Sequence, residues 1–390
     1  QDLFVFGMIS PFHDSEDQEE MWEKFELPYR PEVMFNFGAN SVMSVANREI
    51  VARALAKYKL IVSFDLFLTE TSNFADIVLP DTNALERWDL HPQKYVIPVT
   101  PGSGHWYWSL RQPVVPPLPG ARDWKEVLFE LADRVGFLGD FYLLLNQFLE
   151  MKGKYRLDHD KKYAFSEILD RALRSYHGPD KGLDWFKEHD FVASKRSIEE
   201  IYPGPFVTPR YPVYYEQFLR AGAEVKAVTS ELGLDWDTSD YRALPEWKPC
   251  PAYEEHQPDF DLYAVYYKTP IHFMSWTSEN PWINEVGERH TYYHKVMINT
   301  ETARRKGIKD RDLVQLESSA GKVKGIARVT ECIHPEVVAV AGALGSWAPG
   351  KPIARGKGVH FNALLPFGLD RMDMVSAVVD SCVRVKVTRA

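Results

Sequence analysis

Cysteine is scarce in this chain of 390 residues, and its three copies, Cys250, Cys332 and Cys382, stand far apart. Iron–sulfur clusters and structural zinc sites are usually held by closely spaced cysteines, and no CxxC pair occurs here. The sequence therefore offers no cluster or zinc cage of its own. It predicts buried free thiols and no disulfide framework.

Long hydrophobic runs are also missing. No segment approaches the roughly 20 apolar residues that a membrane-spanning helix needs, and the nearest, at 141–145, is followed by the polar pair Asn146 and Gln147. The first residues carry no basic region followed by an apolar stretch, so no export signal is expected. The chain starts with Gln, as a processed or truncated product would, and both cytoplasm and periplasm stay open, in soluble form or attached peripherally to a membrane complex.

Positive charge is in deficit, with a net charge of −9 and a pI near 5.8. This balance argues against a nucleic-acid backbone as the main partner. Aromatic residues are plentiful, with 11 Trp, 19 Tyr and 22 Phe, which suits large buried interfaces. The length allows two or three domains with sizeable cores.

The most informative segment runs from 32 to 89. A short apolar strand at 33–37 leads into a turn at Gly38, a helix follows, and a second strand at 60–65 ends in Asp65. Ser44 is the expected cap of that helix, and a further short strand is expected at 76–80. This order of strand, glycine turn, helix and strand ending in a carboxylate is how an α/β sheet builds a crevice for a nucleotide.

The chain divides by pattern into three regions. Residues 1–120 alternate strands and helices and close with a proline-rich connector at 111–120. Residues 121–255 are helical at first, with a capping pair at Asp123 and Glu126 and further helices at 140–152 and 164–177, and are then irregular from 178. Residues 256–390 carry six short strands rich in β-branched residues, with one helix capped by Asn299, and these strands predict a closed barrel.

Two blocks of this sequence resemble the molybdopterin oxidoreductases of the dimethyl sulfoxide reductase family, in the C-terminal half of their catalytic subunits. The first block is FNFGANSVMS with LIVSFDLFLTETSNFADIVLP and Glu86. The second comprises TSENPWINEV, the stretch from MINTETARRKG to HPEVVAV, GVHFNALLP and the final VRVKV. Ser72 stands where the family signature has alanine. LERWDL and SENPWINEV look closer to the branch that contains thiosulfate and polysulfide reductases, acetylene hydratase and the aromatic transhydroxylases than to formate dehydrogenases.

The resemblance implies a Rossmann-like α/β/α domain and a six-stranded double-psi barrel that together bind part of a large cofactor. Family members hold two molybdopterin guanine dinucleotides that chelate one molybdenum or tungsten atom. Their [4Fe–4S] cysteines and their metal-ligating residue lie in the N-terminal half, and neither can be located here. The resemblance therefore implies an N-terminal half or partner chain that carries both, and an iron–sulfur electron-transfer subunit. The alternative is a cofactor-free structural subunit of a larger respiratory complex.

Within the first block the resemblance places the nucleotide end of the cofactor near Gly38, Asn40, Ser44, Asp65 and Thr69. A glycine lets the backbone pass close to a ligand, and a carboxylate such as Asp65 accepts two N–H bonds from a planar donor edge such as guanine. The local alternatives are a plain turn at Gly38 and a cap of the following turn by Asp65. Glu70 is interpreted as a solvated or structural charge. Asp76 and Glu86 are interpreted as loop-closing carboxylates.

Within the second block the resemblance places pterin and phosphate contacts after the strand at 261–267. The residues expected there are Lys268, Thr269, His272, Ser275, Thr277 and Asn280. Asn362, in the later segment FNALLP, is expected against the pterin, with Trp347 packed beside it. A lysine can neutralise a pyrophosphate, and the alternative is a polar surface loop. His290 and His294 have helical spacing, but no third ligand accompanies them, so no metal ligand is assigned. No catalytic residue is assigned either.

Overall fold

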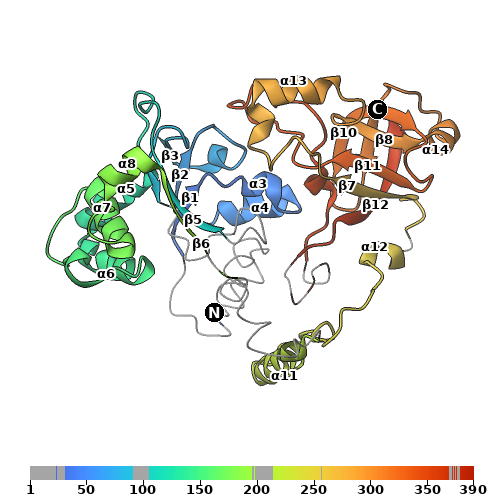
Figure 1. The fold of residues 1–390 in the computed structure, drawn as a ribbon. Coiled ribbons are helices and arrows are strands. Elements are labelled where there is room, and N and C mark those ends of the chain that lie inside the picture. The colour runs from blue at the N-terminus through green and yellow to red at the C-terminus, as the bar shows by residue number, and fades with distance from the viewer. Residues whose placement is uncertain are drawn as a thin grey trace. The chain divides into compact units, whose positions relative to one another are not determined.

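The computed structural model describes residues 23, 31–90, 105–195, 197, 214–255, 257–368, 371, 373, 375 and 378–390 (Figure 1). The chain forms two compact units. The first joins Gln1–Val78 to Tyr214–Ala390, and the second is Leu79–Val213. The expectation of no export signal rests on residues outside the described ranges, and most of the irregular stretch at 201–215 also lies outside them.

The α/β part of the first unit follows the predicted order. Strand β1 (Val33–Phe37) leads through α3 (Ser41–Ser44) and α4 (Arg48–Leu55) to β2 (Leu60–Asp65), and η2 (Ser72–Phe74) precedes β3 (Ile77–Pro80). The sheet order is β1-β2-β3, and β1 runs parallel to β2. Val42, Val51, Leu55 and Ile61 form the core under the helices.

The predicted helix cap at Ser44 is wrong. Ser44 ends α3, and α4 begins after Asn47, whose side-chain oxygen accepts the N–H of Ile50. Asn47 adopts a left-handed backbone conformation with φ of 55°, which asparagine tolerates better than most residues. The chain therefore turns sharply between two short helices where the sequence pattern predicted one.

The β1 side of this sheet is only partly covered. Val33, Phe35 and Phe37 are 49%, 44% and 40% exposed, although Phe37 stacks on the buried Phe64 at 4.9 Å between ring centroids. Parallel sheets are normally covered on both faces. An apolar surface on β1 thus remains open to solvent.

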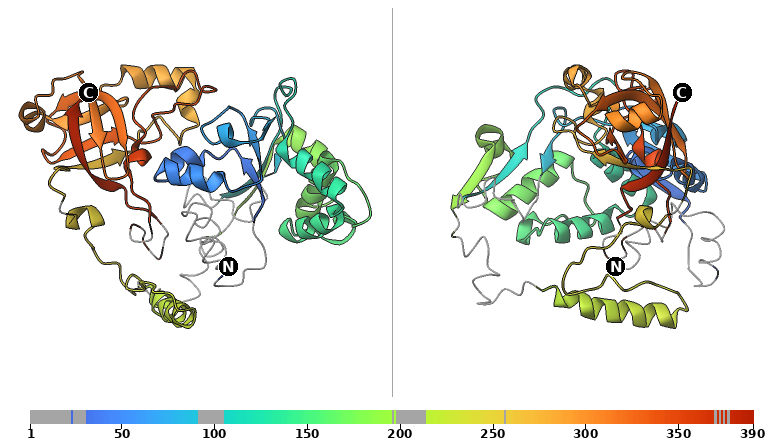
Figure 2. Two further views of the ribbon diagram at one scale, coloured as in Figure 1. Left: turned by 180° about the vertical axis from the view of Figure 1, so that it is seen from behind. Right: turned by 90° about the vertical axis from the view of Figure 1, so that its right-hand side faces the viewer.

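The C-terminal part of the first unit is a closed six-stranded barrel, as predicted. Its strands are β7 (Leu262–Tyr267), β8 (Lys295–Asn299), β9 (Leu313–Glu317), β10 (Lys322–Thr330), β11 (Val337–Ala341) and β12 (Cys382–Arg389). Their order around the barrel is β10-β8-β11-β7-β12-β9. Two neighbouring pairs are parallel, β10 with β8 and β11 with β7. Figure 2 shows the barrel from behind.

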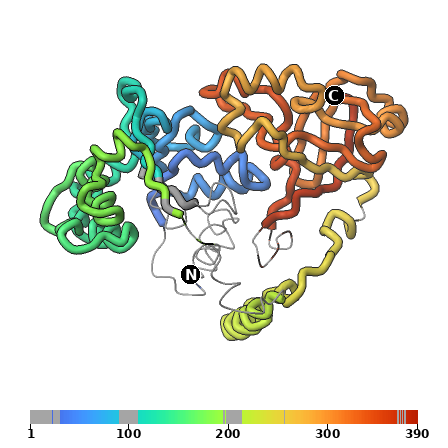
Figure 3. Tube along the Cα trace, in the orientation of Figure 1, coloured from blue at the N-terminus to red at the C-terminus, as the bar shows by residue number. Residues whose placement is uncertain are grey.

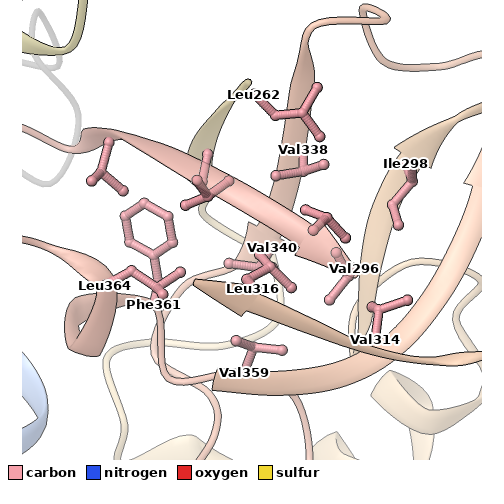
Figure 4. Packing of buried hydrophobic residues seen from close by; sticks show 14 of the residues in the cluster. Leu262, Val296, Ile298, Val314, Leu316, Val338, Val340, Val359, Phe361 and Leu364 are labelled. Atoms are coloured by element: carbon pink, nitrogen blue, oxygen red, sulfur yellow. The ribbon is translucent and has the colours of Figure 1, made fainter. Parts of the chain in front are cut away.

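Alternating residues of these strands fill the barrel with aliphatic side chains. Along β12, Val383, Val385 and Val387 are buried while the residues between them are not. Leu262, Val296, Ile298, Val314, Leu316, Val338 and Val340 converge in the same core with Val359, Phe361 and Leu364 (Figure 4). This alternation is the period of two that a β-strand imposes.

Shorter elements surround the barrel. The predicted helix after Asn299 is α14 (Thr300–Arg305), and its Asn299 cap accepts the N–H of Glu301. A helix that the sequence did not predict, α13 (Pro281–Arg289), follows η4 (Thr277–Glu279), and η5 (Phe361–Leu364) follows β11. A second unpredicted helix, α11 (Glu216–Glu231), precedes α12 (Pro251–Glu254).

The second unit combines a small sheet with a group of helices (Figure 1), and the helices also stand out as coils in the tube of Figure 3. Strands β4 (Asp89–Leu90), β5 (His105–Arg111) and β6 (Phe191–Lys195) form an antiparallel sheet of order β4-β5-β6. The helices are α5 (Trp124–Val135), α6 (Leu138–Phe148), α7 (Phe165–His177) and α8 (Leu183–His189), with η3 (Gly153–Tyr155) between α6 and α7. Asp123 caps α5, as predicted.

Across the described parts of both units, no helix combines the length and the apolar character that crossing a membrane requires.

Candidate functional site

Gly38 closes strand β1 with a backbone that favours glycine. Its φ is +58°, in the left-handed region, and its N–H donates to the carbonyl of Phe64 at 2.8 Å. A Cβ placed there would lie 3.5 Å from the ring of Trp276, so the turn contacts the loop that follows β7. The turn alone explains the glycine, and a ligand contact stays a prediction.

Asn40 lies buried just after this turn, and both the nitrogen and the oxygen of its side-chain amide make hydrogen bonds. Its Nδ2 donates to Oε2 of Glu70 at 2.8 Å, and its Oδ1 accepts from the backbone N–H and the hydroxyl of Thr71 at 3.2 and 3.0 Å. Thr71 in turn accepts the N–H of Val42. These bonds fix the orientation of the Asn40 amide and join the glycine turn to the loop after β2.

Asp65 ends β2 and bonds to the turn that follows. Its Oδ1 accepts the N–H of Leu66 at 2.8 Å and that of Phe67 at 3.4 Å, and its Oδ2 accepts the hydroxyl of Thr69 at 3.1 Å. The side chain is almost buried, and this burial raises its pKa against the opposing effect of those bonds. The cap that was the local alternative is therefore present, and a lone pair on Oδ2 remains for a further donor.

Thr69 and Ser72 close the same loop. The N–H of Thr69 donates to the Ser72 hydroxyl oxygen, and the N–H of Ser72 donates to the Thr69 hydroxyl oxygen. Ser72, which replaces the alanine of the family signature, thus adds bonds that alanine lacks.

Glu70 is a structural charge, and a solvated one is excluded because it is 1% exposed. Its Oε1 accepts from the Ser346 hydroxyl at 2.6 Å and from the N–H groups of Trp347 and Ala348 at 2.8 and 3.1 Å. Burial acts to raise its pKa, but the bonds from Ser346, Asn40 and Trp347 outweigh it and the pKa is lowered. Glu70 thereby joins the loop after β2 to the loop after β11.

Asp76 and Glu86 close loops as predicted. The Asp76 carboxylate accepts the N–H of Ile61 at 2.8 Å, and that of Glu86 accepts the N–H of Asn83 at 2.9 Å. Glu86 belongs to the second unit.

The predicted residues after β7 form a loop with many internal bonds. The hydroxyl oxygen of Thr269 accepts the N–H of His272 at 3.3 Å, and that of Thr277 accepts the N–H of Phe273 at 2.9 Å. Asn280 caps α13 by accepting the N–H groups of Trp282 and Ile283. Lys268 is exposed.

Sequence reasoning missed Lys351, a lysine that is only 2% exposed. Its ammonium donates to the carbonyl of Ser275 at 3.0 Å and to the hydroxyl of Ser278 at 3.3 Å. Burial lowers the pKa of Lys351, while the carboxylates of Glu70, Glu279 and Asp65 act in the opposite direction. No local pattern marks a buried lysine in a loop, so only the three-dimensional contacts identify it.

Asn362 and His360 form hydrogen bonds from the barrel part to the backbone of α3. The Asn362 Nδ2 donates to the carbonyls of Met43 and Ser44 at 2.8 and 3.0 Å, and His360 Nε2 lies 3.1 Å from the Met43 carbonyl. A carbonyl only accepts, so Nε2 carries the hydrogen and Nδ1 is an acceptor. His360 is 7% exposed, and its Nδ1 has no hydrogen-bond partner among the described residues. Trp347 packs on His360, with 5.0 Å between ring centroids.

The histidines near α13 do not assemble a metal site in the described part of the chain. No group of three or more His, Cys, Asp or Glu side chains suited to a metal is found there. His290 stacks on Tyr293 at 3.7 Å between ring centroids, and burial lowers the pKa of His294 to about 4.

The structure thus brings the two sequence blocks together. Asn40 and the Asp65–Ser72 loop contact the segment Ser346–Ala348 through Glu70, and Met43 and Ser44 contact Asn362 and His360. Hydrogen bonds within the first unit therefore join residues 40–72 to the barrel loops at 346–348 and 360–362.

Two family models match this same pair of segments. Molybdopterin oxidoreductase matches residues 14–134, and Molydopterin dinucleotide binding domain matches residues 262–380. Over these two segments the chain is therefore similar to molybdopterin oxidoreductases and to their dinucleotide-binding domain.

Curated relatives agree with this assignment. Thiosulfate reductase molybdopterin-containing subunit PhsA of Salmonella typhimurium is 28% identical over 348 residues, which cover 87% of this chain and 41% of the relative. Probable oxidoreductase YoaE of Bacillus subtilis is 28% identical over 343 residues, covering 87% and 42%. The chain thus spans less than half the length of these relatives.

A solved structure supports the fold. Acetylene hydratase from Pelobacter acetylenicus matches with a TM-score of 0.62 and 16% identity, over 95% of this chain and 46% of that one.

Proposed function

We propose that this chain forms one wall of the cofactor site of a molybdenum or tungsten enzyme that holds two molybdopterin guanine dinucleotides. The observation that carries the proposal is the set of hydrogen bonds that joins the two segments that the family models match. Its residues come from the ends of β1 and β2 and from barrel loops, where ligands of α/β sheets usually bind.

The residues present fit such a group. Pterin and guanine carry N–H donors on planar edges, and the surface offers acceptors that are still available. The buried Nδ1 of His360 has no partner among the described residues, and it stands two positions from Asn362. A buried acceptor without a donor costs free energy, and a cofactor N–H would remove that cost.

On this proposal the cofactor-binding residues keep the roles expected from the resemblance. Gly38, Asn40, Ser44, Asp65 and Thr69 would face the nucleotide end. Lys268, Thr269, His272, Ser275, Thr277, Asn280 and Asn362 would face the pterin and phosphates. Lys351 adds a buried positive charge near Asp65 that suits an anionic ligand.

When bound, the cofactor supplies the metal at which oxygen-atom transfer, hydroxylation or hydration takes place. The chain's own side chains orient the cofactor and exclude water around it. Asp65 accepts donors while Thr69 and the backbone of Leu66 hold its carboxylate in place. No residue of this chain is given a catalytic role.

We further propose that the metal ligand and a [4Fe–4S] cluster come from an N-terminal half or partner chain, with an iron–sulfur subunit as electron partner. The chain spans less than half of its relatives, and PhsA is named as a molybdopterin-containing subunit. The exposed Val33, Phe35 and Phe37 agree with further polypeptide packing on β1.

The finer fold assignments belong to the same proposal. A Rossmann-like α/β/α domain within 1–120 is supported by the parallel pairing of β1 and β2 across a helical connection. A double-psi topology within 256–390 is supported by the two parallel pairs of the barrel. Residues 121–255 would then connect the two domains. The alternative, a cofactor-free structural subunit, is less favoured because both family models are named for molybdopterin.

Metal analysis and the fluorescence of released oxidised pterin test the proposal on the complex isolated with its natural partners. One or two equivalents of pterin are expected, and none in a folded complex would refute the proposal. Asp65→Ala should lower the retained pterin, whereas Glu86→Gln, which keeps a loop-closing acceptor in the second unit, should leave it unchanged. Unaltered pterin in the Asp65 variant would remove that residue from the site.

A further inference from the structure

We propose that Glu70 is a positioning residue of the cofactor site. Its carboxylate holds the glycine-turn segment, through Asn40, at a fixed distance from the barrel segment Ser346–Ala348. The inference rests on the proposed function, since it concerns how the two cofactor-binding surfaces keep their separation. Glu70 itself is enclosed and acts through its neighbours.

The two oxygens of this carboxylate serve different parts of the fold. Oε1 accepts three donors, from the Ser346 hydroxyl and from the N–H groups of Trp347 and Ala348, at 2.6 to 3.1 Å. Oε2 accepts the Asn40 amide at 2.8 Å. One side chain thus bonds to two segments that lie far apart in the sequence.

A negative charge suits this position better than a neutral amide. A buried carboxylate is tolerated when donors surround it, and Glu70 has four donors on its two oxygens. A glutamine could keep the acceptor toward Ser346 but would turn an NH₂ group toward the NH₂ group of Asn40. Asn40 cannot reverse its amide without cost, because its Oδ1 accepts two donors from Thr71.

Backbone packing supports the same separation. A Cβ at Gly350 would lie 2.4 Å from Cβ of Leu68 and 2.6 Å from its carbonyl oxygen. Real Cβ atoms do not approach so closely, so the loop after β2 and the loop after β11 meet in direct contact at this glycine. The hydrogen bonds of Glu70 therefore join two loops, after β2 and after β11, whose backbones are already in contact.

The far end of the barrel loop is held in a similar way. The buried carboxylate of Glu279 accepts the N–H groups of Ile353 and Ala354 at 3.0 and 2.9 Å. Lys351, between these anchor points, donates to Ser275 and Ser278. The segment 346–354 is therefore fixed at one end to the loop that carries Asp65 and at the other to the loop that carries Thr277 and Asn280.

A reversal of donor and acceptor tests the role of Glu70. In Glu70→Gln the Asn40 contact is mismatched, and pterin retained by the isolated complex after dialysis should fall roughly tenfold, the scale of one lost buried hydrogen bond. Adding Asn40→Asp gives residue 40 an acceptor for the new amide while Oδ1 still accepts from Thr71. This double variant should retain more pterin than Glu70→Gln alone, because the atom that Asn40→Asp changes is the one that bonds to residue 70. Glu86→Gln is the matched control and should retain pterin as the unsubstituted complex does.

Several results would overturn the inference. Full retention in a folded Glu70→Gln complex would do so, and so would a folded double variant that retains no more pterin than the single one. If Glu70→Gln does not fold, Ser346→Ala takes its place, since it removes one donor to Oε1; it should lower retention several-fold, and unchanged retention would refute the role. Loss of pterin from the unsubstituted complex would instead refute the proposed function.

Discussion

The barrel and the α/β part of the first unit are built on different principles. The barrel is closed, and its core consists of aliphatic side chains such as Leu316 and Val340 that need no hydrogen-bond partners. The α/β part has three strands, an exposed apolar edge and several buried polar side chains, among them Asn36, Asn40 and Glu70. Its buried groups must each find a donor or acceptor.

This difference means that the apolar barrel core and the polar α/β interior respond differently to substitution. The stability of an apolar core is sensitive to changes in side-chain volume. It does not depend on hydrogen-bond partners from segments outside the core. A polar interior depends on partners from other segments, and in this chain the barrel loop provides some of them. On the proposed function, the barrel core therefore acts as the rigid support, and the α/β loops together with the barrel loops carry the side chains that would meet the ligand.

The largest effect is expected in the barrel core. Leu316→Ala removes a fully buried side chain and should lower the free energy of unfolding by about 2 to 5 kcal/mol. Phe35→Ala, on the exposed side of β1, is the contrasting variant and should cost far less. Chemical denaturation followed by tryptophan fluorescence measures both. Equal losses would contradict the view that the barrel is the rigid support.

A smaller effect is expected in the polar interior. Asn36 is 3% exposed and donates to the hydroxyl of Ser63 at 2.9 Å and to the carbonyl of Ala39 at 3.0 Å. Asn36→Ala should cost about 1 to 3 kcal/mol because it leaves the partners unsatisfied. A double-mutant cycle with Ser63→Ala should give a coupling of about 0.5 to 1.5 kcal/mol. A coupling near zero would show that this interior does not depend on pairing.

Acid should destabilise the fold through its buried imidazoles. Burial lowers the pKa of His294 to about 4, against an ordinary value of 6.5, so its neutral form is favoured in the fold. The stability it contributes is complete above pH 6.5 and is lost as the pH falls toward 4. His294→Gln should therefore show a smaller fall in thermal midpoint between pH 7 and pH 5. An identical fall would exclude His294 as a contributor.

The smallest effect on stability belongs to the thiols, which report on local exposure. Cys332 is exposed, contrary to the sequence prediction, and hydrogen bonds from Thr330 and Tyr292 lower its pKa. Burial raises the pKa of Cys382 to about 12. Iodoacetamide at pH 8 should alkylate Cys332 much faster, since the thiolate is the reacting form. Peptide mass analysis over time measures the order, and faster labelling of Cys382 would contradict it.

Much of the fold could be predicted because its signals are local. The period of two in β12 and the β-branched strands before it predict the barrel, and the glycine turn predicts the passage from β1 to helix. The start of α13 also had a local signal that was overlooked. Asn280 followed by Pro281 is a cap followed by a proline in the first turn.

The remainder could not be predicted, because its causes lie far apart in the sequence. Helix α11 fully buries only Gly222, and the side chain that packs on it, that of Tyr241, lies outside the helix. The environments of Lys351 and His360 depend on segments that the chain reaches only by folding. The error at Ser44 has a local cause, since Asn47 adopts the left-handed conformation and takes the capping role.

The hydrogen bond between Glu70 and Ser346 also has a consequence for folding during translation, because it can form only after both residues have been synthesised. The two residues are separated by 276 positions, so a ribosome adding about 5 to 20 residues per second makes Ser346 roughly 14 to 55 seconds after Glu70. The second unit, which lies between them in the chain, emerges complete in that interval. The α/β segment must wait for the barrel, and its nascent form is the one that needs protection from aggregation.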